Sequence, residues 1–424
     1  MEHKPPRNFR NAWRVGAAAT AAVTIAVAMT GCSTSGGSTS GMDGSTVKMY
    51  TWIGNSADSA QWSAYTTEGH KVNSAVKVSF TGPPIGDYYT KLPTVLKGST
   101  APCIVTLQNG QLPPYVSALE SLNSYAKAAG VKLSDYNTAM IEQLSSGGKA
   151  YALPYDAEPT VIFYNKKLFK EAGVPDPSLS WTTKDFVAAA KATTQDGHYG
   201  FAIGQGVYPI SYWMTANNEG NYVKNGKANL LTPAFEKRFQ FEVDLATKDK
   251  AAAPLQAAAS GTFPDIDAFG NSQAAMLMNG TYDLSNEQSK IRKANLGVAT
   301  LPSDNGNPYA SVAGTGFAMT KTCSNKKAAF AAIEAMTSEK AQRSIAVSRN
   351  QVPARPDSIS AWQQAAGPQA VAVLKKLTSR TTVPAVPTDI NQVQTLFTQY
   401  ETDAFSDKSS VKQVLQQVQS GLGQ

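Results

Sequence analysis

The chain has 424 residues, of which 42% are apolar, 9% aromatic and 16% charged, a length and composition that predict two to three domains with a sizeable core and exclude a disordered chain. None of the apolar runs is long enough to indicate a protein with several membrane spans. The net charge of +7 falls to +4 without the residues before Cys32, and the basic residues are too scattered for a nucleic-acid binder, which gathers Lys and Arg on one face.

The N-terminal residues have the pattern of an export signal. A basic segment comes first, with Lys4, Arg7, Arg10 and Arg14, and an apolar stretch follows at 15–29. That stretch is short for a transmembrane span. We therefore expect a signal peptide over residues 1–31, outside the folded part of the protein.

The end of this signal is similar to the lipobox of bacterial lipoproteins. Small residues precede Cys32 in the sequence Met-Thr-Gly-Cys, although Met29 stands where the family usually has Leu. The resemblance implies that Cys32 becomes the lipidated first residue. Residues 32–45 then form a flexible, Ser/Thr/Gly-rich tether that holds a soluble domain at the outer face of the cell membrane. A plain secreted protein and a single membrane anchor are the alternatives.

The remaining chain alternates strands and helices. Short apolar or alternating runs predict strands at 47–52, 76–80, 104–107, 161–164, 296–299 and 316–319. Thr182 and Asp185 form a capping-box variant at the start of a helix that ends at Gly197, with Trp181 and Phe186 as its hydrophobic staple. Helical periodicity also marks two later segments, with apolar faces made of Phe235, Phe239, Val243 and Ala246 after Thr232-Pro233, and of Val411, Val414, Leu415 and Val418. This alternation predicts an α/β fold with mostly parallel sheet.

A search for catalytic motifs is mostly negative. The sequence has neither a Gly-rich phosphate loop nor a Gly-x-Ser-x-Gly elbow. After the signal peptide only His70 and His198 remain, without the spacing of metal ligands, and both are expected on the solvated surface. We predict no catalytic residue, no metal and no cofactor. Carboxylates are plentiful, so composition alone leaves a two-carboxylate glycosidase open.

A resemblance to a known family begins at residue 147. The segment Gly-Gly-Lys-Ala-Tyr-Ala-Leu-Pro-Tyr-Asp at 147–156, then Glu158-Pro159 and 163–169, is similar to the signature of family 1 extracellular solute-binding proteins, the sugar-binding components of ABC importers. The similarity continues, in the family's order, through 171–175, 180–182, 273–282, 301–302, 314–318, 337–342 and 352–355. It therefore covers nearly all of the mature chain.

The resemblance implies the fold and its mechanism. We expect a two-lobed periplasmic-binding-protein-like fold of type II, maltose-binding-protein-like, with a mainly parallel sheet and flanking helices in each lobe. Lobe I would comprise 46–156 and 312–352, and lobe II 157–311 and 353–424, joined by crossover hinge strands near Asp156, Ser311 and Val352. A mono- or oligosaccharide would bind between the lobes of a monomer and favour closure. The closed form would dock on an ABC transporter permease, with ATP hydrolysed elsewhere.

The predicted ligand contacts combine aromatic faces with polar side chains. Pyranose C–H faces pack on Trp or Tyr, while amides and carboxylates bond the hydroxyls. The predicted stacking residues are Trp52, Tyr208, Trp213 and Tyr282, the last in place of the family's usual Trp. Polar contacts are expected from Gln108, Asn109, Tyr155, Asp156 and Glu158, and Gly314 would let the backbone approach the ligand. The alternatives are packing for the aromatic residues, hinge bonds for 155–158 and turns for the rest.

Two cysteines follow Cys32, and each borders a predicted strand of the same lobe. Outside the membrane such thiols commonly pair, so we expect a disulfide between Cys103 and Cys323. Cys103 stands where the family usually has Asp. Two separate buried thiols are the alternative, because the sequence does not give the Cβ spacing.

Two other function classes stay open at this stage. One is a surface glycosidase, which would release reducing ends from oligosaccharides. The other is a binding protein for a non-sugar solute such as a polyamine, a phosphodiester or a metal complex. An anionic ligand needs convergent Arg or Lys. Arg355 is the best such candidate, and it also fits the family's Pro-Ala-Arg turn, so the sequence favours a sugar.

Overall fold

The computed structural model describes residues 46–98, 100–195, 197–255, 262–378, 380–382 and 385–423. The chain divides after Ser40 into two units, and every described residue belongs to the second, Gly41–Gln424. The predicted signal peptide, Cys32 and the tether lie outside the described residues. Within those ranges no helix has the length and apolarity needed to cross a membrane.

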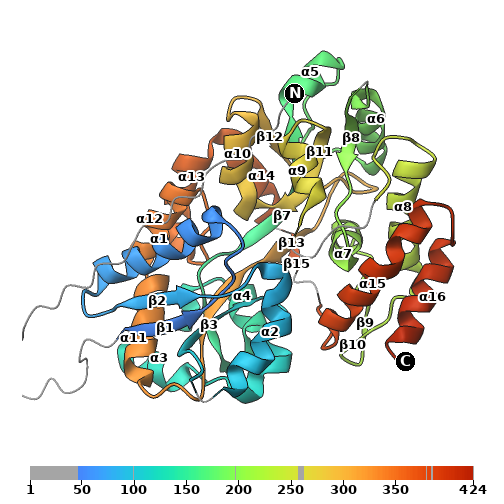
Figure 1. Ribbon diagram of the computed structural model, residues 1–424. Coiled ribbons are helices and arrows are strands. Elements are labelled where there is room, and N and C mark those ends of the chain that lie inside the picture. Colours follow the sequence, from blue (N-terminus) through green and yellow to red (C-terminus); the bar gives the residue numbers. More distant parts are fainter. Residues whose placement is uncertain are drawn as a thin grey trace, which may run out of the picture. The chain divides into compact units, whose positions relative to one another are not determined.

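The first of two main sheets has five strands in the order β2-β1-β3-β14-β6 (Figure 1). Their bounds are Val78–Thr81, Val47–Tyr50, Ile104–Gln108, Thr315–Met319 and Ala152–Pro154. The associated helices are α1 (Ser56–Val72), α2 (Ile85–Lys97), α3 (Asn123–Ala129), α4 (Thr138–Gln143), α11 (Lys326–Thr337) and α12 (Glu339–Arg349), with short 3-10 turns at Pro113–Ala118 and Leu133–Asp135. One hydrophobic cluster, which includes Trp62, Leu107 and Phe317, fills this part.

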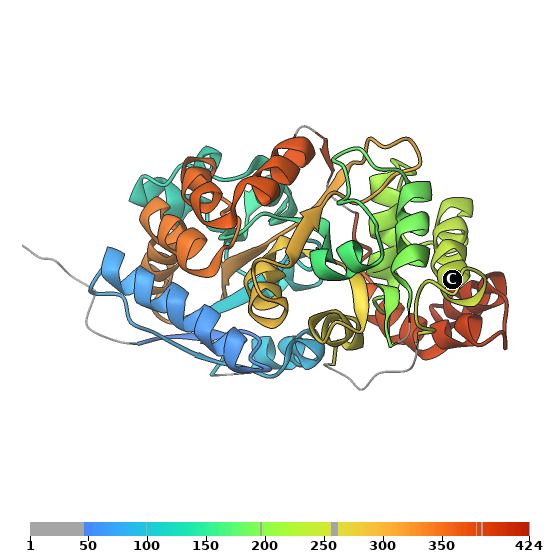
Figure 2. The ribbon, with the colours of Figure 1, turned by 90° about the horizontal axis from the view of Figure 1, so that it is seen from above.

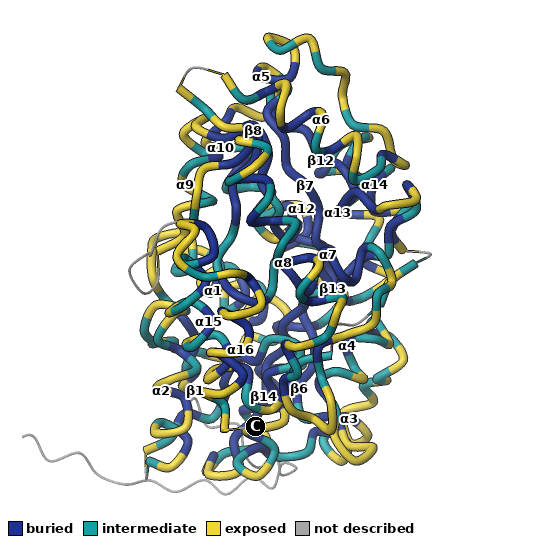
Figure 3. Tube along the Cα trace, turned by 90° about the vertical axis from the view of Figure 1, so that its right-hand side faces the viewer, coloured by how far each residue is buried: buried dark blue, intermediate teal, exposed yellow. Residues whose placement is uncertain are grey.

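The second sheet has the order β15-β13-β7-β11-β8, and β12 also pairs with β7. The strands are β15 (Thr381–Thr382), β13 (Ala310–Ala313), β7 (Glu158–Asn165), β11 (Ala274–Gly280), β8 (Tyr199–Ala202) and β12 (Leu296–Ala299). The associated helices are α5 (Lys166–Glu171), α6 (Thr183–Thr193), α7 (Val207–Ala216), α8 (Pro233–Thr247), α9 (Pro264–Gly270), α10 (Leu284–Ile291), α13 (Ile359–Ala366), α14 (Pro368–Thr378), α15 (Ile390–Phe405) and α16 (Val411–Gly421). Two hydrophobic clusters include alternate residues of β7, which is buried along its whole length (Figure 3).

The smaller elements complete the description. Two-residue strands pair as hairpins, β4 (Ser145–Ser146) with β5 (Lys149–Ala150) and β9 (Val223–Lys224) with β10 (Lys227–Ala228). The 3-10 turns η3 (Thr281–Asp283) and η4 (Pro356–Ser358) precede α10 and α13.

Local sequence signals match the observed helices. Thr182 and Asp185 form the expected reciprocal capping box of α6, although the helix ends at Thr193, before the predicted Gly197. The Trp181 and Phe186 rings of the staple meet edge to face at 5.7 Å. In α8 and α16 the predicted apolar faces are the buried ones. These predictions are confirmed because short-range capping and periodicity decide them.

Strand pairing is mixed, where the alternation of strands and helices predicts mostly parallel sheet. β14 runs antiparallel to β3 and β6, and β7 runs antiparallel to β11, β12 and β13. The reason is the path of the chain. It leaves the first sheet through β6 and β7 and returns through β13 and β14, so these two nearly continuous routes run in opposite directions (Figure 2).

Candidate functional site

Two buried carboxylates occupy the place where the chain passes between the sheets. Asp156 accepts a hydrogen bond from the Thr315 N–H at 2.5 Å through Oδ1, and from Gln351 Nε2 at 2.9 Å through Oδ2. Glu158 accepts from the Val352 N–H at 2.9 Å and from the Thr281 hydroxyl. The two side chains thus accept hydrogen bonds from the segments that meet here. We call Tyr155, Asp156, Glu158 and Gly314 the crossing residues.

The surroundings of these carboxylates are dry. Asp156 is 4% exposed and Glu158 1%. Burial raises the pKa of both, and the neighbouring Asp156 raises that of Glu158 further, while the hydrogen bonds act in the opposite direction. Each carboxylate oxygen already has a protein partner. The arrangement therefore fits the hinge-bond alternative better than the predicted ligand contact.

Tyr155 and Gly314 are also taken up by packing. The Tyr155 ring is 1% exposed and lies 4.6 Å from the Tyr65 ring and 4.8 Å from that of Phe317. A Cβ added at Gly314 would lie 2.2 Å from Met140 Sδ and 2.7 Å from the Asp156 carbonyl oxygen. Gly314 is therefore required for close contact between segments of the protein, which accounts for this glycine without a ligand.

Gln108 ends β3, Asn109 follows it, and both are partly exposed. Asn109 Oδ1 accepts from the Gly314 N–H at 3.0 Å, and its Nδ2 donates to the Val312 carbonyl at 3.4 Å. The Gln108 N–H donates to the Tyr89 hydroxyl at 3.0 Å. The Asn109 side chain thus bonds the backbone of the segment that returns to the first sheet. The Gln108 side chain remains a candidate ligand contact.

The two predicted stacking tryptophans are covered. Trp52, 9% exposed, packs edge to face on Trp62 and Tyr88, with ring centroids 5.0 and 5.6 Å away. Trp213 has no exposed surface, and its indole N–H donates to Glu242 Oε1 at 2.8 Å. The predicted stacking role of Trp213 does not fit this structure, because core residues cover its ring completely. Trp52 offers at most a ring edge.

Four tyrosines from three elements keep exposed surface. We call Tyr89, Tyr208, Tyr212 and Tyr282 the tyrosine cluster. Tyr89 follows the first turn of α2, Tyr208 and Tyr212 lie one turn apart on α7, and Tyr282 lies in η3 directly after β11. Tyr282 is 53% exposed and the other three are partly exposed. Two of these four, Tyr208 and Tyr282, were predicted as ligand contacts.

The geometry of α7 turns two rings of the cluster to one side. Residues four apart share a helix face, and the Tyr208 and Tyr212 rings stack with centroids 6.4 Å apart and planes at 27°. The Tyr208 hydroxyl accepts from Gln111 Nε2 at 3.3 Å, which joins α7 to the segment after β3. Burial raises the pKa of Tyr208 to about 12, so the hydroxyl stays neutral near pH 7.

Tyr282 is held by its hydroxyl, which leaves its ring uncovered. The hydroxyl donates to Asn279 Oδ1 at 2.6 Å, and Gly280 has no Cβ to collide with the ring. Desolvation holds the pKa of Tyr282 well above its usual range, and Tyr212, Asp283 and Asp265 add to this effect. Asp265 lies at the start of α9 and is partly exposed. A carboxylate thus stands near the exposed ring.

This combination suits a neutral, hydroxyl-rich molecule. Tyrosine faces pack on apolar C–H surfaces, while phenol, amide and carboxylate groups bond hydroxyls. Sequence reasoning missed Tyr89, Tyr212 and Asp265 as site residues. The spacing of four between Tyr208 and Tyr212 was a usable signal for Tyr212, whereas nothing local distinguishes Asp265.

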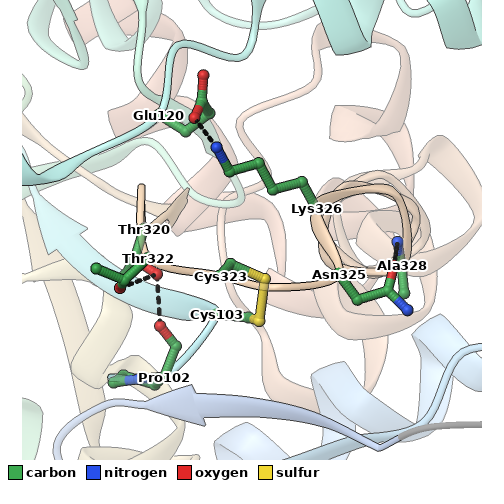
Figure 4. The surroundings of a disulfide bond; sticks show 9 residues. All are labelled: Pro102, Cys103, Glu120, Thr320, Thr322, Cys323, Asn325, Lys326 and Ala328. Atoms are coloured by element: carbon green, nitrogen blue, oxygen red, sulfur yellow. Dashed lines mark hydrogen bonds and ion pairs between the residues drawn. A yellow bond between two sulfur atoms is a disulfide. The ribbon is translucent and has the colours of Figure 1, made fainter. Parts of the chain in front are cut away.

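A disulfide joins Cys103, just before β3, to Cys323, just after β14 (Figure 4). The two Cα atoms are 4.5 Å apart although 220 residues separate them in sequence. Antiparallel pairing places Ile104 opposite Met319 and so brings the two cysteines to the same end of the sheet. The disulfide belongs to the first sheet, and neither cysteine is part of the tyrosine cluster.

The histidines show no catalytic arrangement. His70 Nδ1 is 2.8 Å from the Val76 carbonyl oxygen, and the backbone of His198 pairs with Gln195 in a turn. In the part of the chain that the structure describes, no three His, Cys, Asp or Glu side chains are grouped to hold a metal ion.

The chain spans less than half the length of the curated relatives that it matches. The diacetylchitobiose binding protein DasA of Streptomyces coelicolor is 26% identical over 136 residues, which are 32% of this chain and 31% of that protein. The mannitol-binding protein of Pseudomonas aeruginosa is 25% identical over 185 residues, or 41% of this chain and 42% of its own length.

Solved structures match far more completely, and they show the fold. An ABC substrate-binding protein of Listeria monocytogenes in complex with cycloalternan has a TM-score of 0.79 at 23% identity, over 89% of this chain and 98% of that chain. The maltose-bound MalE3 of T. maritima has a TM-score of 0.74 at 20% identity, over 89% and 99%. The expected two-lobed, type II periplasmic-binding-protein fold is confirmed. Because the sequence profile of the bacterial extracellular solute-binding proteins also matches residues 54–343, this chain belongs to that family.

Proposed function

We propose that the protein captures a neutral mono- or oligosaccharide between two lobes and delivers it to the permease of an ABC importer. The lobes are 46–156 with 312–352, and 157–311 with 353–424. The observation that carries the proposal is the tyrosine cluster, in which Tyr282 is exposed and the other three tyrosines are partly exposed. Tyr89 belongs to the first lobe and the other three tyrosines to the second, so a sugar in contact with both would favour closure.

The relatives support a carbohydrate as the ligand class. Diacetylchitobiose, mannitol, cycloalternan and maltose are named as ligands of the similar proteins. The proposed contacts are the tyrosine cluster with Gln108, Gln111 and Asp265. Trp52 lies at the edge of this set, and the crossing residues act as hinge bonds.

An anionic ligand is less well supported. Arg355, the best cation by sequence, is 2.6 Å from Asp357 and 3.6 Å from Asp135, and its guanidinium lies over the Tyr136 ring. A cation engaged in this way is not free to bind an anion. We infer that the protein binds its ligand without converting it, since the adjacent carboxylates Asp156 and Glu158 are fully engaged by protein donors.

Calorimetry with the purified mature domain tests the proposal. A panel of mono- and oligosaccharides and sugar alcohols should contain a ligand, with diacetylchitobiose, maltose and mannitol as first probes. The same mixtures should show no new reducing ends after incubation. Binding of a polyamine or a phosphodiester with no response to any carbohydrate contradicts the proposed ligand class, and released reducing ends contradict a pure binding role.

We further propose that the chain is exported and held at the outer face of the cell membrane by a lipid on Cys32. The order of basic segment, apolar segment and Met-Thr-Gly-Cys supports this. Cys32→Ser should move the protein from the membrane fraction to the soluble fraction. A variant that stays membrane-bound would show that the apolar segment itself is the anchor.

A further inference from the structure

Helix α7 carries two rings of the tyrosine cluster but has no side-chain cap of its own. Its N-cap residue is Gly206, with φ +91° and no side chain to accept a hydrogen bond. The first N–H groups of a helix lack partners within the helix. The start of α7, immediately before Tyr208, must therefore be held by groups from elsewhere in the chain.

Helix α15, almost two hundred residues later, supplies these groups. Glu401 Oε2 accepts from the Gly206 N–H at 2.9 Å, and Gln394 Oε1 accepts from the Val207 N–H at 3.2 Å. Glu401 and Gln394 are seven residues apart and so lie on one face of α15. In Figure 1, α15 lies beside α7, and the two helices are in contact.

The backbone conformation and the packing both favour glycine at 206. A Cβ on Gly206 would lie 1.8 Å from Gln394 Nε2. The positive φ of Gly206 gives the same restriction. The backbone at Gly206 thus fits closely against the side chains of Glu401 and Gln394. This contact fixes where α7 begins and the direction in which its first turn faces.

Stability alone gives a poor account of Glu401. The side chain is 2% exposed, and Oε1 has no hydrogen-bond partner among the described residues. Burial raises its pKa to about 8, while the bond from Gly206 lowers it. Glu242 of α8 is a second buried carboxylate nearby, and the charge of Glu401 raises its pKa. A buried acid with half of its acceptors unused is costly to the fold.

We propose that Glu401 and Gln394 are positioning residues for ligand binding, which set the direction in which Tyr208 and Tyr212 face the ligand. The inference rests on the proposed function, because carbohydrate affinity is one of its readouts. It makes α15, the second-last helix, part of the specificity apparatus of the site, although neither residue belongs to the proposed contact set.

The test compares variants that differ only in the acceptor offered to α7. Glu401→Leu has similar volume and no acceptor, and it should weaken carbohydrate binding by about tenfold or more. Glu401→Gln keeps an acceptor for Gly206 and should stay within about threefold of wild type. Gln419→Leu is the matched control: Gln419 is 8% exposed on α16 and bonds the Leu230 N–H and the Ala228 carbonyl, in a segment without cluster tyrosines. Its affinity should be unchanged.

A double-variant cycle separates positioning from general damage. In a Tyr208→Ala, Tyr212→Ala background, Glu401→Leu should change the remaining affinity by less than about twofold, because the rings through which it acts are gone. An undiminished loss in that background, or wild-type affinity of Glu401→Leu itself, overturns the proposal. If Glu401→Leu does not fold, Gln394→Leu serves as the second uncapped variant.

A ligand-free measurement keeps this inference distinct from the proposed function. In unliganded Glu401→Leu, the amides at the start of α7 should exchange with solvent about tenfold faster than in wild type, while those of β7 are unchanged. Equal exchange at α7 contradicts the positioning role whatever the ligand is. If the wild-type protein binds no carbohydrate but the variant still shows the faster exchange, only the proposed function is contradicted.

Discussion

The crossing residues and the tyrosine cluster differ in how much of their binding capacity the protein itself uses. At the crossing, both oxygens of Asp156 and of Glu158 have protein donors, and the side chains are buried. In the cluster, Tyr208 and Tyr282 use their hydroxyls in hydrogen bonds and keep ring surface exposed. Binding capacity therefore remains with the aromatic faces, while the carboxylates have none left to offer.

The two regions are nevertheless joined. Thr281, which donates to Glu158, directly precedes Tyr282. A change in the crossing can therefore reach one ring of the cluster through a single residue. Variants in the two regions measure how far stability and binding can be separated.

The largest effect on stability is expected from the disulfide, which is remote from the tyrosine cluster. Cys103→Ser with Cys323→Ser opens a loop with a sequence separation of 220, and it should lower the free energy of unfolding by about 2–5 kcal/mol. Denaturant unfolding measures this, with ligand affinity unchanged. Two cysteines that react with an alkylating agent in the native protein, before any reduction, would show that the bond does not form.

The largest effect on binding is expected from Tyr282→Ala. The exposed ring offers apolar area and stacking worth roughly 2–4 kcal/mol to a bound sugar, a loss of about 30- to 1000-fold in affinity. The melting temperature of the unliganded protein should not change, because 53% of the residue is exposed. Tyr199→Ala, 40% exposed at the start of β8, is the control and should bind normally. Wild-type affinity in Tyr282→Ala removes this ring from the site.

Asp156→Asn should show the reverse pattern. It leaves one acceptor for Thr315 but turns an amide donor toward Gln351, so we expect a loss of roughly 1–3 kcal/mol in the free energy of unfolding. Affinity should change by less than about threefold. Sugar binding that is lost at an unchanged melting temperature would restore Asp156 as the ligand contact that the sequence predicts.

The smallest effect concerns pH and the carboxylates that flank α7. Burial raises the pKa of Glu242 and of Glu401 to about 8, against an ordinary value near 4.3 in the unfolded chain. The folded state then holds more protons between these values, so the stability that each group contributes is fully present below about pH 4.3 and is lost as pH rises toward 8. Glu242→Gln removes one of these two groups and should make the fall shallower, measured by denaturant unfolding at pH 5 and pH 8. A wild-type stability that rises from pH 5 to pH 8 has the opposite sign and contradicts these raised values.

Part of the site could be predicted because it follows strand ends in an α/β fold. Tyr208 and Tyr282 come shortly after buried strands, where clefts open in such a fold. Tyr282 was also predicted because it takes the place of the family's usual Trp. Trp213 shows the limit of this argument. It is one residue from Tyr212 on α7, but a step of one turns it by about 100° around the helix, into the core and toward Glu242. Exposure on such a helix depends on what packs against it, which a single sequence does not contain.

Local sequence by itself determined the capping of α6, the apolar faces of α8 and α16 and six of the strands, because each depends on residues a few positions apart. The family resemblance added the two-lobed fold. Only the tertiary structure decided that Asp156 and Glu158 bind the chain crossings, that Trp213 is buried, and that Glu401 caps a helix whose N-cap glycine is 195 residues away. The physical reason is that a polar group is free for ligand only when no protein partner reaches it. Those partners are set by contacts between segments that are distant in the chain.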